Sequence, residues 1–168
     1  MDQANDATRM FDFFARNGEV NRLTLDALSD ELLGFEDDSG GFSIGQHLAD
    51  MLSVRYDRLE QVSPAHSEAI DDPTVPDSPT WLRTDTVSGV RTDFDACDAA
   101  VVAAVRDAIR EGRAFEPWYA SHPATLLQHC IVHDAHHRGQ IAALVRRSGR
   151  SRGDRDALED RTWAIWRA

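Results

Sequence analysis

The spacing of the apolar residues constrains the fold of this chain most strongly, because they recur at steps of three and four along most of its length. Such spacing puts apolar side chains on one face of a helix, whereas a strand needs strict alternation. No alternating pattern of useful length is present. We therefore predict an all-α four-helix bundle with a short C-terminal helix at 156–166. The four long helices are expected at 5–33, 44–62, 87–108 and 126–144.

Two local signals set the connections between these helices. Ser43 followed by Gln46 forms the pattern of a capping box, which predicts that the second helix begins at residue 44. Residues 63–83 hold four of the six prolines and show no sustained periodicity. This segment is expected to be a long crossover that lets the second and third helices run parallel. Gly18 in the first helix is expected to allow close approach of a neighbouring helix.

Length and charge restrict the class of protein. The chain has 168 residues, 42% of them hydrophobic, which suits one domain spanning 1–168. Its longest fully apolar run, 99–105, is far shorter than the about 20 residues that a bilayer requires. The net charge of −11 opposes binding to a phosphate backbone, so no nucleic-acid partner is expected.

The two cysteines indicate a cellular compartment. Cys97 and Cys130 both lie in apolar helical patterns, so we expect two free thiols in the core. Sparse cysteine usage fits a reducing cytosol, and no basic and apolar leader begins the chain. The sequence thus favours a soluble cytoplasmic protein without a membrane partner.

The histidines carry the strongest chemical signal. Five of the seven lie between residues 122 and 137: His122, His129, His133, His136 and His137. On a helix, His133 and His137 project from one face, so both rings can place a nitrogen about 2.0–2.1 Å from one metal ion. His129 extends the same stripe by one turn and is a candidate partner beside the ligands. A third ligand must come from another helix.

His47 is the best candidate for that third ligand. It occupies an inward position near the start of the second helix, where an unpaired imidazole would cost stability. Three histidines leave one coordination position open, which is the arrangement of catalytic metal sites. Asp50 is a candidate to orient the ring of His47. The competing interpretation is that these histidines are hydrogen-bonded core residues; Cys130 is assigned to the core wall rather than to the metal.

Two other functions remain open on these residues. The run from His133 to His137 imitates the H-E-x-x-H helix of zinc proteases, with Asp134 in place of the glutamate base. Aspartate is one methylene shorter, so it reaches a metal-bound water less well, and a metal-dependent hydrolase is the alternative. A non-enzymatic metal-binding stress protein is the third possibility, because no base or nucleophile beyond the metal site stands out.

The stretch H-D-A-H-H-R-G-Q, from His133 to Gln140, resembles the H-x-x-x-H-R-G-Q signature of the DinB-like family. The segment F-S-I-G-Q-H-L, which contains His47, is similar to the second-helix motif of that family. The resemblance extends over nearly the whole chain. It implies an up-down-down-up four-helix bundle, a homodimer, and a divalent metal, most often zinc or nickel, held by His47, His133 and His137.

The same resemblance implies a class of reaction. Members of the family with known chemistry include bacillithiol transferases and mycothiol-dependent maleylpyruvate isomerases. We therefore expect an S-transferase in which the metal activates a low-molecular-weight thiol for attack on an electrophile, with the crossover contributing to the electrophile pocket. By position, Arg138 is expected to pair with an acid at the surface, Gly139 to allow a close helix contact, and Gln140 to donate a hydrogen bond near the metal.

Overall fold

The computed structural model describes residues 3–38, 40–149 and 152–167. Its elements are α1 (Gln3–Asp26), a 3₁₀ turn η1 (Asp30–Leu32), α2 (Ile44–Val62), α3 (Pro64–Ser67), α4 (Val87–Arg110), α5 (Thr125–Arg147) and α6 (Arg152–Arg167). No strand is present in these ranges, which contain only two isolated β-bridges. The prediction of an all-α protein is confirmed.

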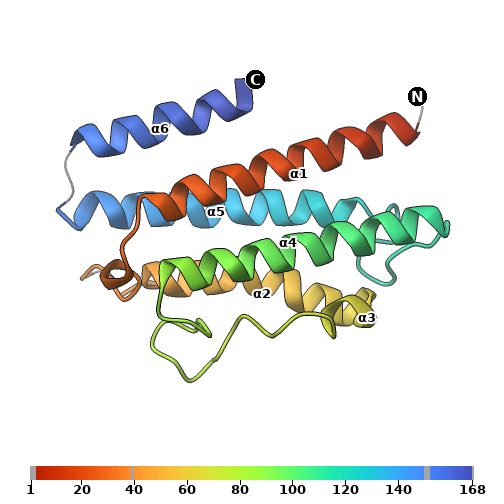
Figure 1. The fold of residues 1–168 in the computed structure, drawn as a ribbon, viewed down its shortest axis with the longest axis horizontal. Helices are drawn as coiled ribbons and strands as arrows, with labels where there is room; N and C mark the ends of the chain where they lie inside the picture. The colour runs from red at the N-terminus through yellow and green to blue at the C-terminus, as the bar shows by residue number, and fades with distance from the viewer. Residues whose placement is uncertain (1–2, 39, 150–151, 168) are drawn as a thin grey trace.

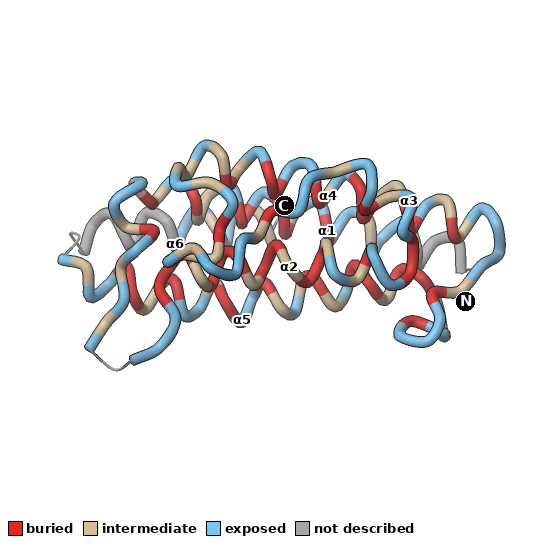
Figure 2. The backbone as a smooth tube through the Cα atoms, turned by 90° about the horizontal axis from the view of Figure 1, so that it is seen from below, coloured by how far each residue is buried: buried red, intermediate tan, exposed pale blue. Residues whose placement is uncertain are grey.

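The long helices form a bundle in which α2 packs against α4 and α5, and α1 packs against α4, α5 and α6. Figure 1 shows α1 and α5 running in one direction and α2 and α4 in the other, with α6 lying along α1. Buried positions recur along each long helix in Figure 2, as the spacing of three and four predicts. None of the described helices combines the length and the apolar character needed to span a bilayer.

The first helix ends at Asp26, earlier than predicted. The segment after Asp26 does not extend α1, because it forms hydrogen bonds with the start of α2 instead. The carbonyl oxygens of Leu33 and Phe35 accept hydrogen bonds from the N–H groups of Gly45 and Ile44 at 2.7 and 3.0 Å. Leu33 stays buried in this arrangement, so the apolar periodicity continued past the end of the helix.

The predicted start of α2 and the crossover are both observed. Ser43 and Gln46 form the reciprocal capping box, and α2 begins at Ile44. The crossover runs from the end of α2 to Thr86, the N-cap of α4, and includes the short helix α3. Within it, Trp81 has a positive φ of 60°. The crossover thus places an aromatic residue near the N-terminal end of α2.

The core consists of two clusters of buried apolar side chains, one toward each end of the bundle. Cys97 and Cys130 are free and buried, as predicted. Burial raises the pKa of each thiol to about 12, so neither is a thiolate at neutral pH. These cysteines are core residues.

The two glycine predictions have opposite outcomes. A Cβ at Gly18 would lie 3.2 Å from Oδ2 of Asp98 on α4, so α1 does approach a neighbouring helix closely there. The prediction for Gly139 is wrong, because a Cβ there would meet nothing within 4 Å. The face of α5 that carries Gly139 is exposed, so no helix packs on it.

Candidate metal centre

The three predicted histidine ligands come together between α2 and α5. His47 lies in the first turn of α2, and His133 and His137 lie one turn apart on α5. Nδ1 of His47 is 3.0 Å from Nδ1 of His137. The ring centroids of His133 and His137 are 4.5 Å apart, and those of His47 and His137 are 5.3 Å apart. The antiparallel packing of α2 on α5 therefore gathers three imidazoles.

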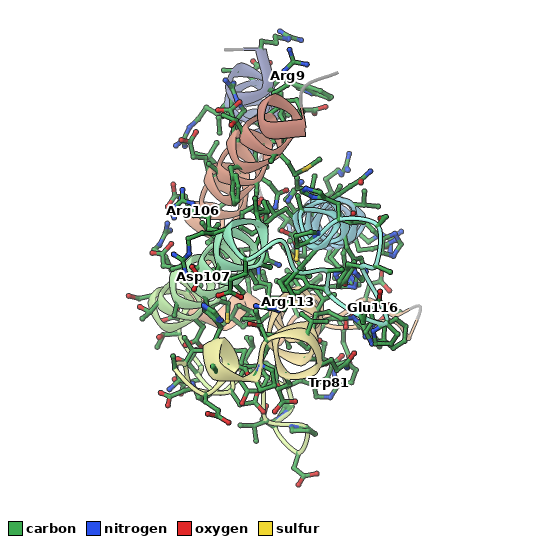
Figure 3. All side chains as sticks on the ribbon, turned by 90° about the vertical axis from the view of Figure 1, so that its right-hand side faces the viewer. Arg9, Trp81, Arg106, Asp107, Arg113 and Glu116 are labelled. Carbon is green, nitrogen blue, oxygen red and sulfur yellow. The ribbon has the colours of Figure 1, made fainter. Side chains whose placement is uncertain are left out.

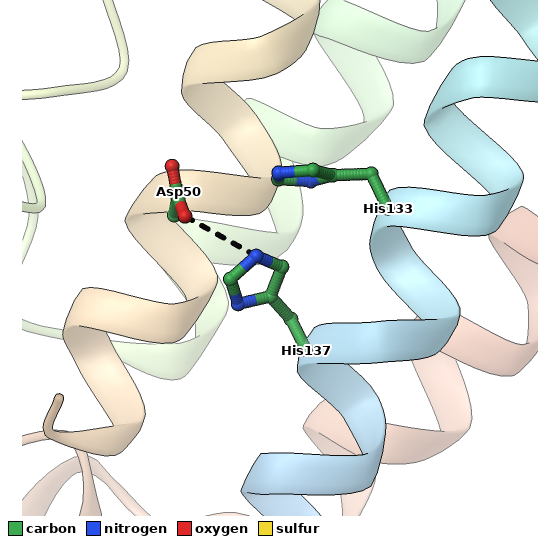
Figure 4. A group of neighbouring side chains, drawn as sticks. All are labelled: Asp50, His133 and His137. Atoms are coloured by element: carbon green, nitrogen blue, oxygen red, sulfur yellow. Dashed lines mark ion pairs between the residues drawn. The ribbon is translucent and has the colours of Figure 1, made fainter. Parts of the chain in front are cut away.

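Asp50 lies at the same site, one turn further along α2. Its Oδ2 is 3.2 Å from Nε2 of His137. One ligand atom from each of Asp50, His133 and His137 lies within 4.8 Å of the others, and Figure 4 shows the three side chains converging from α2 and α5. The prediction that Asp50 contacts His47 is corrected: its carboxylate meets His137, because the antiparallel helices bring residue 50 level with that turn of α5.

Two features of this group fit a bound divalent metal. Nδ1 of His133 is buried and has no hydrogen-bond partner among the described residues, although buried polar atoms are normally paired. Two nitrogens that each lie 2.0–2.1 Å from one ion are separated by about 2.9–3.4 Å for coordination angles between 90° and 109°. The 3.0 Å between the nitrogens of His47 and His137 falls in that range. A donor set of three imidazole nitrogens suits zinc and nickel. Asp50 contacts the other ring nitrogen of His137, Nε2, rather than the Nδ1 that faces His47.

The protonation of the three histidines also suits metal binding. Burial, the largest cause in each case, lowers the pKa of His47, His133 and His137. The neighbouring Asp50 opposes this effect at all three rings. Imidazole binds metals in its neutral form, so the rings are ready to ligate at neutral pH.

A comparison with known protein families assigns this chain to one of them. The sequence model of the DinB family matches residues 1–168. The chain belongs to the DinB family. No curated protein and no solved structure matches it significantly. Its membership, together with the clustered histidines and Asp50, supports a metal-dependent function for this DinB protein.

Metal affinity should depend on pH in a defined direction. A protonated imidazole cannot ligate, and the pKa of each histidine lies below its ordinary value of about 6.5. We expect constant zinc affinity from about pH 8 to about 6.5 and a fall below that, by up to about tenfold per pH unit for each proton taken up. Zinc titrations at several pH values measure this. Affinity that stays constant down to about pH 4.5 would contradict ligation by histidine.

Asp134 does not occupy the position of a protease base. Arg55 donates to its Oδ1 at 2.9 Å and to its Oδ2 at 2.7 Å. Asn17 and Asn21 donate to Oδ2 at 2.6 and 2.7 Å. These four hydrogen bonds occupy both carboxylate oxygens, so Asp134 is directed to α1 and α2 rather than to the histidine group. Asp134 belongs to a fully buried polar network between α1, α2 and α5.

The R-G-Q residues of the DinB signature also differ from the predictions. Arg138 does pair with an acid, since its Nη1 lies 3.9 Å from Oδ2 of Asp134, but not at the surface: its side chain is 13% exposed. It also donates to Oδ1 of Asn17 at 2.8 Å and of Asn21 at 2.6 Å. It therefore holds the two asparagines that bind Asp134. Gln140 is exposed, and in the described part of the chain it makes no hydrogen bond to the histidine group. The helical spacing predicted that these residues lie on a helix, but it could not predict which residues they contact.

Two of the remaining histidines lie next to the histidine group, and two lie away from it. His129 lies next to His133: its ring centroid is 6.0 Å from that of His133, and its Nδ1 is 2.7 Å from Oη of Tyr119. His136 is exposed and meets the ring of His137 edge-on at 5.1 Å. His66 and His122 bond with Ser63 and with the N–H of Ala124 respectively, away from the metal centre.

An aromatic pair next to His47 was not predicted. The ring of Phe42 is 5.5 Å from that of His47, and Trp81 meets Phe42 edge-on at 4.8 Å. Phe42 is 39% exposed. A signal was present, since Phe42 directly precedes the N-cap of α2 and Trp81 is an aromatic residue in a proline-rich crossover. Only the structure shows that these two segments meet beside the histidines.

Proposed function

We propose that this DinB protein is a divalent-metal-dependent S-transferase that uses a low-molecular-weight thiol as cosubstrate. The observation that carries the proposal is the convergence of His47, His133 and His137, in which Nδ1 of His133 is buried and finds no hydrogen-bond partner in the described part of the chain. These three residues would hold the ion, with zinc and nickel the metals that the donors suit. A bound divalent cation lowers the pKa of a thiol, so that thiolate is available at neutral pH.

The chain itself offers no thiolate for this reaction. Cys97 and Cys130 are buried, and their pKa values are raised to about 12. A thiol nucleophile must therefore come from a small molecule that reaches the metal centre. In this proposal the histidines hold the ion, and the cosubstrate supplies the sulfur.

The aromatic pair supports an apolar second substrate. Phe42 and Trp81 present ring surface next to His47, and Phe42 is partly exposed. An apolar electrophile gains free energy by covering such a surface. The crossover that carries Trp81 thus contributes to the electrophile side of the site.

A metal-dependent hydrolase is the second candidate, and Asp50 favours it. A carboxylate with two histidines is a ligand set of catalytic zinc sites, and Asp50 stands with His133 and His137 in that way. Its side chain is 38% exposed, so it is also accessible to a substrate. A hydrolase would need no thiol, which separates the two functions in one assay.

The deciding experiment is a screen of the metal-loaded protein with bacillithiol, mycothiol, glutathione and cysteine against a chlorinated electrophile, beside esters and amides. We expect thiol-dependent turnover that is lost in His137→Ala and kept in His66→Ala, whose imidazole lies outside the site. Thiol-independent hydrolysis that is lost in His137→Ala would overturn the transferase and support the hydrolase. A protein that binds metal but turns over neither class would be a non-enzymatic metal binder.

We also propose that the protein is a cytoplasmic homodimer. Trp163 is 50% exposed, and large exposed aromatic side chains often lie in interfaces. Light scattering at micromolar concentration should give twice the 18.7 kDa mass of the chain. A single species of 18.7 kDa would reject the dimer.

A further inference from the structure

A second cluster of polar and aromatic side chains adjoins the metal centre, toward the C-terminal end of α2. It consists of Arg58, Trp118, Tyr119 and His129. The guanidinium of Arg58 lies over the ring of Trp118 at 4.7 Å, and Oη of Tyr119 is 2.7 Å from Nδ1 of His129. The loop between α4 and α5 holds the aromatic residues in place, since the N–H of Tyr119 donates to the carbonyl of Phe115 at 2.6 Å.

This cluster is continuous with the histidines. His129 lies one turn from His133 on α5, a rise of about 6 Å, and their ring centroids are 6.0 Å apart. Arg58 lies eleven residues after His47, which on a helix returns to within about 20° of the same face. Its positive charge acts on both Tyr119 and His129. His129 therefore connects the histidine group to the cluster that contains the Arg58 guanidinium.

Arg58 is free to bind an anion. Its guanidinium donates to Oε1 of Gln61 at 2.9 Å and stacks on Trp118, and no carboxylate of the described residues forms an ion pair with it. The side chain is partly exposed. A guanidinium fixed against an aromatic ring keeps its in-plane donors available for a carboxylate. In a chain of net charge −11, such a local positive group is needed to attract an anion.

We propose that Arg58, supported by Trp118, binds the carboxylate of the thiol cosubstrate. The inference rests on the proposed function and defines its substrate class: a small thiol that carries a carboxylate a few bonds from the sulfur. The carboxylate lies against Arg58 while the sulfur reaches the histidine group, whose His133 lies one turn of α5 from His129. Tyr119 and His129 line the path between them.

The first test needs neither metal nor thiol. The indole N–H of Trp118, assigned in NMR spectra with Trp118→Phe, is followed while glutarate is added to the metal-free protein. We expect a saturable shift of this resonance that disappears in Arg58→Gln. Arg106→Gln is the matched control, because Arg106 also stacks on an aromatic ring, Phe11 at 5.2 Å, and lies across the bundle from Glu116 in the loop of Trp118 (Figure 3). No shift in the wild type, or an equal shift in Arg58→Gln, would overturn the proposal.

The second test links this site to the thiol. Binding of 3-mercaptopropionate and of the uncharged 3-mercaptopropanol to the cobalt-substituted protein is followed by the visible spectrum. We expect the carboxylate to improve affinity about tenfold, and Arg58→Gln to remove that advantage. Equal affinities in the wild type would refute the assignment to the thiol. If neither thiol binds but glutarate still shifts Trp118, the S-transferase proposal fails and the carboxylate is assigned to another substrate.

Discussion

Asp134→Ala should destabilise the folded protein by about 3–5 kcal/mol, because it leaves the guanidinium of Arg55 buried without its main partner. The side chains of Arg55 and Asp134 are both 0% exposed, and Arg55 makes two hydrogen bonds to the carboxylate. Burial, the largest single cause, opposes the charged form of Asp134, but Arg55, Asn21 and Arg138 together outweigh it, so the pKa of the carboxyl is lowered. The free energy of unfolding from urea denaturation measures the effect.

Two further variants test the explanation. Asp95→Ala removes an ion pair with Arg22 whose side chains are 45% and 49% exposed, so it should cost less than about 1 kcal/mol. Replacing both buried partners with Arg55→Met and Asp134→Leu should recover only part of the stability lost in Asp134→Ala: it removes the buried guanidinium that lacks its carboxylate, but Asp98 loses its 2.6 Å ion pair with Arg55. A loss in Asp134→Ala as small as that in Asp95→Ala would contradict the account of the network.

The double replacement His133→Ala with His137→Ala should lower zinc affinity by more than about a thousandfold, since it removes both ligands that α5 supplies. Competition with a chelating dye measures the affinity. His136→Ala is the control on the same helix: His136 is exposed and meets only the edge of the His137 ring, so the affinity should stay within about threefold of the wild type. Zinc affinity unchanged in the double variant would show that the ion binds elsewhere.

Local signals predicted most of the fold. The spacing of apolar residues by three and four predicted the long helices, because burial of one face of each helix stabilises the bundle. The capping box at Ser43 and Gln46 predicted the start of α2, since its two hydrogen bonds are made within four residues. The predicted end of α1 was wrong. The observed end depends on hydrogen bonds from Ile44 and Gly45, which lie far along the chain.

The clustering of His133 and His137 was predictable, because it follows from their spacing within one helix. His47 was also placed correctly on an inward face, and the structure brings it next to His137. The partners of Asp50, Asp134 and Arg138 were not predictable. A helical period gives the direction of a side chain but not the residue that an adjacent helix presents to it, and that residue depends on how the helices are staggered.

Zinc content and affinity of the untagged protein in three forms, wild type, His47→Ala and Asp50→Asn, decide whether three histidines hold the ion. We expect one ion per chain in the wild type. We expect loss of bound zinc in His47→Ala, because this removes the ligand from α2, and retention in Asp50→Asn with affinity reduced by about 10–100-fold, as for a partner that orients a ligand. Full zinc content and unchanged affinity in His47→Ala would contradict the three-histidine site.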